Sequence, residues 1–191
     1  MMASQITGSV IAGGRIQFEN MDVRALYGTL QTKQKNNSVE KISLKEIKLI
    51  GLALDKQTTN KNGQSAIDCG SHWQKFEAGN YADRIPNKTT NEIFAVYHAY
   101  EGDFTAPYSY FIGCRVDGDT EVPPGMHSLI IPEASYIKIV AGGKMPDCVA
   151  AAWQDIWSRD IERAYRADFE IYDARSQDWN NAEVDIYVGV K

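Results

Sequence analysis

The sequence predicts an α+β domain in which two copies of a strand-helix-strand-strand unit form one antiparallel sheet, with helices on one face and a ligand groove on the other. Four segments of the second half repeat four segments of the first half in the same order, which indicates a duplicated unit. In each matched pair both members have the pattern of the same element, either a β-branched strand or a helix with apolar periodicity. Helices that follow sheet strands in this order generally pack on one face of the sheet.

The repeated segments can be aligned by residue type. The matches, first half against second, are EIKLIG (46–51) with YIKIVA (136–141), SHWQKFEAGN (71–80) with AAWQDIWSRD (151–160), FAVYHA (94–99) with FEIYDA (169–174), and YFIGCRV (110–116) with IYVGVK (186–191). A single match of this kind would be chance, but four in one order predict two equivalent half-domains.

The helix of the second unit has the clearer signals. Pro146 suits the first turn of a helix, and Asp147 suits its positive end. An apolar stripe follows at helical spacing, made of Val149, Ala152, Trp153, Ile156 and Trp157. The helix of the first unit, over residues 66–79, is weaker because Gly70 lowers its helix propensity.

Residues 1–41 differ from the rest of the chain. Their second half, GTLQTKQKNNSVEK, is polar and without hydrophobic period, which is typical of a linker. We therefore expect an N-terminal appendage over residues 1–41 and one domain over residues 42–191.

Composition excludes several classes of protein. A net charge of −5 disfavours an electrostatic nucleic-acid binder. The apolar runs have the length of strands, so we expect no membrane span, and the N-terminus lacks a signal-peptide pattern. The three cysteines and three histidines are widely scattered, so the sequence predicts no metal site, no cofactor and a reducing cytoplasm.

Strand alternation predicts which residues face the ligand groove. If Val184, Ile186 and Val188 meet the helices, Tyr187 points to the opposite face. The same reasoning, applied to the strand at residues 169–173, buries Phe169 and Ile171 and turns Glu170 and Tyr172 towards the groove. The repeat adds two more aromatic residues to this face, Tyr97 and Phe111.

A carboxylate among aromatic rings suits a flat organic cation. Ring faces attract positive charge, and a desolvated carboxylate supplies the counter-charge. Tyrosine and glutamate are also ordinary residues on a solvated sheet face, so the pattern alone leaves both interpretations open. Trp73 and Trp153 can lie at the edge of the groove or in the helix core.

Several stretches resemble the GyrI-like small-molecule-binding domain, which also occurs in integron cassette proteins and in bacterial regulators. They are EIFAVYHAYEGDFTAPYSYFIGCRVD, EVPPGMHSLIIPEASYIKIVAGG, AAWQDIWSRD and RAYRADFEIYDARS, followed by AEVDIYVGVK. The resemblance covers residues 42–191 and implies a duplicated α+β fold. It also implies that Glu170 neutralises a lipophilic cation within an aromatic pocket.

The resemblance implies a stand-alone binding module. Regulators with this domain carry a DNA-binding segment, and the first forty residues are too short and too rich in Gly and Asn to provide a helix-turn-helix. Homodimerisation or a regulator protein partner would fit such a module.

Other functions stay open at this point. Some relatives resemble hydrolases of cyclopropane-type toxins, in which Glu170 would act as general base with Tyr172 or Tyr187. A protein-interaction module of the gyrase-inhibitor type would use acidic residues, namely Asp155, Asp160, Glu162, Asp168 and Asp173. Haem binding is known in a related fold, but no histidine of this sequence is convincingly placed as an axial ligand.

Overall fold

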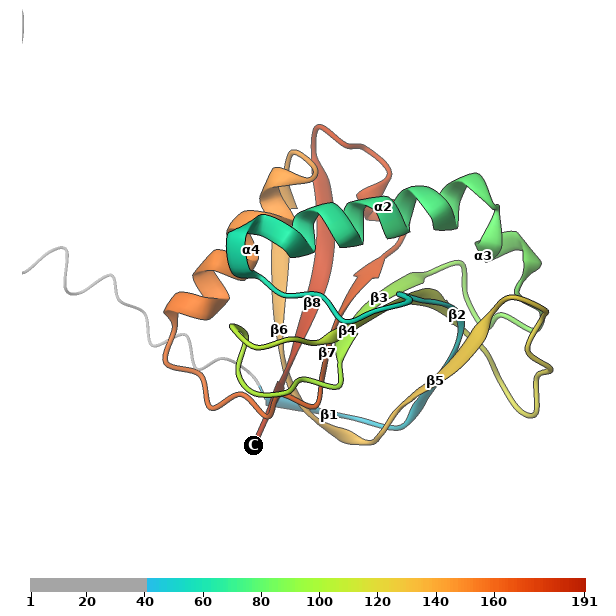
Figure 1. The fold of residues 1–191 in the computed structure, drawn as a ribbon, viewed down its shortest axis with the longest axis horizontal. Helices are drawn as coiled ribbons and strands as arrows, with labels where there is room; N and C mark the ends of the chain where they lie inside the picture. Colours follow the sequence, from blue (N-terminus) through green and yellow to red (C-terminus); the bar gives the residue numbers. More distant parts are fainter. Residues whose placement is uncertain (1–40) are drawn as a thin grey trace, which may run out of the picture. The chain divides into compact units, whose positions relative to one another are not determined.

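The computed structural model describes residues 41–191 and shows one antiparallel sheet of eight strands with helices on one face (Figure 1). The strands follow the order β1-β6-β8-β7-β3-β4-β2-β5, and every neighbouring pair is antiparallel. The predicted α+β class is therefore confirmed. The predicted appendage lies, except for Lys41, outside the described residues, and the domain boundary stays a prediction.

The strands and helices have these bounds. The strands are β1 (Lys41–Leu44), β2 (Ile47–Ala53), β3 (Ile93–His98), β4 (Ser109–Arg115), β5 (His127–Ile131), β6 (Ala134–Gly143), β7 (Ala167–Tyr172) and β8 (Ala182–Val190). The helices are α2 (Gln64–Ala78), α3 (Tyr81–Arg84) and α4 (Asp147–Ser158). Two short 3₁₀ turns, Lys61–Gly63 and Ala174–Ser176, complete the assignment.

The predicted duplication appears as two equivalent halves of the sheet. The series β2-α2-β3-β4 corresponds to β6-α4-β7-β8, as the repeat indicated. The halves meet where β3 pairs with β7, and there Ala95 lies directly opposite Glu170. These two residues occupy the same position of the repeat. A local twofold axis therefore passes between Ala95 and Glu170.

The edge strands are exchanged between the halves. β1 precedes β2 in the chain but pairs with β6, and β5 precedes β6 but pairs with β2. Sequence patterns predicted neither β1 nor β5. Each unit is thus a five-element series whose first strand, β1 or β5, pairs with the other half. This exchange links the two halves at both edges of the sheet.

Both faces of the curled sheet are filled. Val184, Ile186 and Val188 pack with Val149 and other residues of α4 on the helix face. The opposite face carries its own apolar core, made of Ile47, Leu49, Phe94, Val96, Phe111, Ile131, Tyr136, Ala167 and Phe169. The prediction of a ligand groove on the face without helices is therefore wrong. The sheet curls (Figure 1), and the apolar side chains of this second core fill that face.

Within residues 41–191 no helix combines the length and apolar character that a membrane crossing needs. The same part of the chain brings together no cluster of three or more His, Cys, Asp or Glu side chains that could hold a metal ion.

Candidate functional site

Glu170 lies on the helix face of the sheet and not on the opposite face. The register of β7 against β8 places Glu170 opposite Ile186, which packs under α4. Glu170 and Tyr172 therefore point towards the helices, contrary to the prediction. Alternation fixes the sides within one strand, but the loop between two strands sets their register, and a one-residue shift reverses the faces.

A cavity of about 520 Å³ lies between the sheet and the two long helices. Its wall includes Glu170 and residues of α2, α4, β3, β4 and β7. Most of the large side chains in the wall are aromatic, among them Trp73, Tyr97, Tyr110, Trp153, Trp157 and Tyr172. The volume falls within the range of about 300–1,000 Å³ that is usual for small-molecule sites.

Three donors converge on the Glu170 carboxylate, which is only 1% exposed. Oε1 accepts hydrogen bonds from the Tyr97 hydroxyl at 2.8 Å and from the Trp153 indole N–H at 2.6 Å. Oε2 accepts one from the Tyr172 hydroxyl at 2.7 Å. Because Tyr97 and Tyr172 are equivalent in the repeat, each half-domain contributes one hydroxyl to the same carboxylate.

Aromatic contacts hold these donors in place. The Tyr97 ring meets Trp153 edge-on at a centroid distance of 5.1 Å, and the Tyr172 ring meets Trp73 in the same way at 4.9 Å. The indole N–H of Trp73 donates to the Tyr110 hydroxyl at 2.9 Å. The two tryptophans, also equivalent in the repeat, thus frame the carboxylate from α2 and α4.

Burial controls the protonation of the site. Desolvation raises the pKa of Glu170, and the hydrogen bonds from Trp153, Tyr172 and Tyr97 offset only part of this rise. Burial and the nearby Glu170 charge raise the pKa values of Tyr97 and Tyr172 well above their ordinary values. The hydroxyls therefore remain donors at neutral pH, and burial makes the ionised form of Glu170 costly unless a positive charge compensates it.

The Cys69 thiol in the same wall is not activated as a nucleophile. Burial, followed by the charge of Glu170, raises the pKa of its thiol to about 12. Nearby on α2, His72 is buried and its ring Nε2 lies 3.1 Å from the Leu52 carbonyl oxygen. The stretch from Cys69 to His72 is thus an ordinary part of helix α2 that packs on the sheet.

The structure brings together five of the seven predicted ligand-binding residues. Glu170, Tyr172, Tyr97, Trp73 and Trp153 all line the cavity. Phe111 and Tyr187 do not, because their strand positions place them on the opposite face. There Phe111 is part of the apolar core, and Tyr187 stacks on Phe169 at a centroid distance of 4.8 Å.

Several lining residues were missed by the sequence reasoning. Tyr110 of β4 lies on the helix side of the sheet and lines the cavity. Tyr100 and Phe104 come from the loop after β3, and Arg163 comes from the segment after α4. Irregular segments such as these give no periodic signal, so sequence patterns could not place them.

Not all of the acidic residues predicted to contact a protein partner are free on the surface. Asp155, Asp160 and Glu162 are exposed, but Asp168 is fully buried and pairs with Arg163. Asp173 accepts hydrogen bonds from Arg175. Asp155 also pairs with Arg159, so three of the five residues are engaged with arginines of the same chain.

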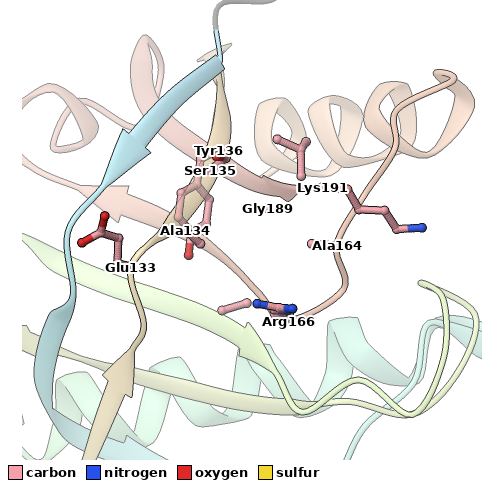
Figure 2. A pocket seen from close by; sticks show the side chains of 10 residues that line it. Glu133, Ala134, Ser135, Tyr136, Ala164, Arg166, Gly189 and Lys191 are labelled. Carbon is pink, nitrogen blue, oxygen red and sulfur yellow. The ribbon is translucent and has the colours of Figure 1, made fainter.

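A smaller cavity of about 420 Å³ lies at the ends of β6 and β8 (Figure 2). Glu133, Arg166 and Lys191 in its wall are exposed, and most of the remaining wall is alanine, glycine and backbone. Tyr136 is its one aromatic residue. Because its charged groups are solvated and do not converge, the larger cavity is the better candidate site.

The chain is similar to several known proteins. The family model described as integron-associated effector binding protein (Cass2) matches residues 42–190. A putative transcriptional regulator, YobU of Bacillus subtilis, is 28% identical over 102 residues, which are 52% of this chain. The matched region is 64% of the length of that relative, so the chain spans less than two thirds of it.

Two solved structures share the fold. An integron cassette protein from the mobile metagenome of Vibrio cholerae superimposes with a TM-score of 0.60 and 22% identity, over 80% of this chain and 95% of that one. SAV2435, solved with bound tetraphenylphosphonium, superimposes with a TM-score of 0.65 and 16% identity, over 80% of this chain and 93% of that one. The family model covers most of the chain, and the chain therefore belongs to the family of integron-associated effector binding proteins, as the GyrI-like resemblance predicted.

Proposed function

We propose that this protein binds lipophilic cations and acts by sensing or sequestering them. The observation that carries the proposal is the buried Glu170 carboxylate at the wall of an aromatic cavity. Membership of an effector-binding family supports small-molecule binding. SAV2435, which has a similar fold, was solved with a bound lipophilic cation, and this supports the class of ligand.

The cavity favours a cation through two effects. An ionised Glu170 attracts a positive charge more strongly here than in water, because the surroundings have a low dielectric constant. The faces of the aromatic rings add cation–π attraction, and their area matches apolar substituents on the ligand. An apolar ligand without charge would gain only the second contribution and would leave the buried anion uncompensated.

The three donors to Glu170 make the site ready before the ligand arrives. Tyr97, Tyr172 and Trp153 fix the orientation of the carboxylate, so the protein spends little free energy on rearrangement when the ligand binds. Tyr97 and Tyr172 contribute one hydroxyl from each half of the sheet. The Glu170 carboxylate lies near the local twofold axis. A ligand at this position would contact both halves.

The hydrolase alternative has weaker support. A general base needs a free lone pair for the attacking water, and the Glu170 oxygens already accept three hydrogen bonds, which leave about one of four lone-pair positions. The cavity wall holds no thiolate nucleophile, because the Cys69 thiol has its pKa raised to about 12. Binding without chemistry is therefore the function that this geometry favours.

We place the protein in the cytoplasm, in line with three cysteines that are all free. The absence of a DNA-binding segment stays a prediction, since residues 1–40 lie outside the described structure.

Calorimetric titration with tetraphenylphosphonium tests the proposal. We expect Glu170→Gln to weaken binding by about 1–3 kcal/mol, the range for a buried hydrogen bond or charge-assisted contact. Glu133→Gln serves as the matched control, because Glu133 is exposed and lines only the smaller cavity. Equal affinities for wild type and Glu170→Gln would contradict the charge-neutralising role.

A further inference from the structure

A second buried charge lines the same cavity. Arg163 is only 5% exposed and comes from the segment between α4 and β7. A cationic side chain in a cavity proposed for cations needs an explanation, because like charges repel and repulsion is strong at low dielectric constant.

The charge of Arg163 is compensated within the fold. Its Nη2 donates to Asp168 Oδ2 at 2.5 Å, and both side chains are buried. Asp168 also accepts hydrogen bonds from the Tyr100 hydroxyl at 2.6 Å and from the Gly189 amide at 2.7 Å. The pair is therefore close to neutral as seen from the cavity, and Glu170 remains the uncompensated charge there.

The hydrogen-bonding capacity of Arg163 is not used up. Its Nε and Nη1 groups have no acceptor within residues 41–191. Aromatic rings surround the guanidinium, with the Tyr165 centroid 4.4 Å and the Trp153 centroid 5.8 Å from Cζ. Such rings attract positive charge but offer no lone pair, and buried donors without an acceptor are rare and costly.

We propose that Arg163 forms a second subsite in the cavity, which binds an uncharged oxygen acceptor of the ligand such as a ketone, ester or amide carbonyl. This inference rests on the proposed function. A neutral acceptor suits the subsite better than a carboxylate, since Asp168 already neutralises Arg163 and Glu170 is a further buried anion. A small shift of the guanidinium would bring its free N–H groups to the ligand.

Trp153 lies between the two subsites. Its indole N–H donates to Glu170, while Arg163 lies against its ring. The ligand that fits both subsites therefore carries its cation and its carbonyl on opposite sides of an aromatic group that packs on this indole. The proposed ligand class is thereby narrowed from lipophilic cations to aromatic cations with a carbonyl remote from the charge.

A pair of matched cations tests the subsite. The compounds are (4-benzoylbenzyl)trimethylammonium and (4-benzylbenzyl)trimethylammonium, which differ only in a carbonyl replaced by a methylene. Calorimetry on the full chain should show the benzoyl compound binding about tenfold more tightly, as one hydrogen bond to a charged donor allows. In Arg163→Lys, which keeps a cation for Asp168 but loses the Nε and Nη1 donors, the ratio should fall to about one.

The outcomes separate the two proposals. If neither compound binds and tetraphenylphosphonium does not bind either, the proposed function itself fails. If both compounds bind wild type equally, or if the preference persists in folded Arg163→Lys, the carbonyl subsite is overturned while cation binding stands. Should Arg163→Lys not fold, as circular dichroism would reveal, the ratio for wild type still decides the question.

Discussion

Glu170 shows how one buried carboxylate can depend on its neighbours for both position and charge. Its two oxygens accept hydrogen bonds from Tyr97, Tyr172 and Trp153, yet burial still raises its pKa above the ordinary value. The ionised form of Glu170 is thus held in position but is not fully compensated. Neutral donors stabilise it in part, and a cation would supply the remainder.

This balance makes cation binding depend on pH. A cation prefers the ionised form of Glu170, so its affinity should be full above the raised pKa of Glu170 and should fall as pH drops through that pKa. Below it the loss is about tenfold per pH unit, because the proton must leave before the cation binds. Tyr97 and Tyr172 do not contribute, since their own pKa values are raised well above the ordinary value.

Tyr172→Phe tests this coupling. It removes one donor from the anion and keeps the ring against Trp73, so the pKa of Glu170 and the pH midpoint for tetraphenylphosphonium binding should both move upward. Titrations of wild type and variant over a pH series would measure the shift. Glu170→Gln should bind with an affinity that hardly changes over the same series, and a midpoint that stays unchanged in Tyr172→Phe would refute the coupling.

At the scale of elements, the pairing of β2 with β4 requires two glycines. Gly51 and Gly113 are partners in this pair, and a Cβ on Gly51 would lie 2.0 Å from the Ile112 carbonyl oxygen. A Cβ on Gly113 would lie 2.3 Å from the Ile50 carbonyl oxygen. The two strands can approach this closely only without side chains there, so the glycines contribute to the curled form of the sheet.

Two Gly→Ala variants should therefore have opposite effects. Gly51→Ala should destabilise the protein by about 1–3 kcal/mol, because the clash is with backbone atoms that must shift. Gly70→Ala should stabilise it by about 0.5–1 kcal/mol, because Gly70 lies in α2 and its added Cβ would meet no atom within 4 Å. Urea unfolding followed by circular dichroism measures both, and a stable Gly51→Ala variant would show that the strands can separate without cost.

For the whole molecule, the duplication creates one asymmetric site from two similar halves. The first half supplies Tyr97 and Trp73, and the second half supplies the equivalent Tyr172 and Trp153. Each tyrosine packs edge-on against the tryptophan of the other half. The equivalent of Glu170 is Ala95, which lies directly opposite it in the sheet. A single anion thus occupies the centre of an aromatic frame that is nearly symmetric.

Sequence patterns predicted the repeat, the two long helices and most of this frame, but not the face on which it lies. Residue identity within β7 and β8 fixed the alternation of each strand separately. The loop between Tyr172 and Ala182 sets their relative register, and its length carries no periodic signal. Because this register could not be predicted, Phe111 and Tyr187 were grouped with Glu170. Arg163 was missed because it lies in an irregular segment, which also has no periodic signal.

The exchanged strands were missed for a related reason. β1 has four residues and β5 has five, so their alternation is too short to distinguish from a loop. Their partners lie in the other half of the domain, and only the three-dimensional sheet reveals the exchange.

The position of a bound cation tests the central claim most directly. A crystal structure of the complex with tetraphenylphosphonium should show the phosphorus in the larger cavity, near Glu170 and between α2 and α4, with phenyl rings against Trp73 and Trp153. A cation found instead in the smaller cavity near Tyr136, or on the opposite face of the sheet at Phe111 and Tyr187, would contradict the account.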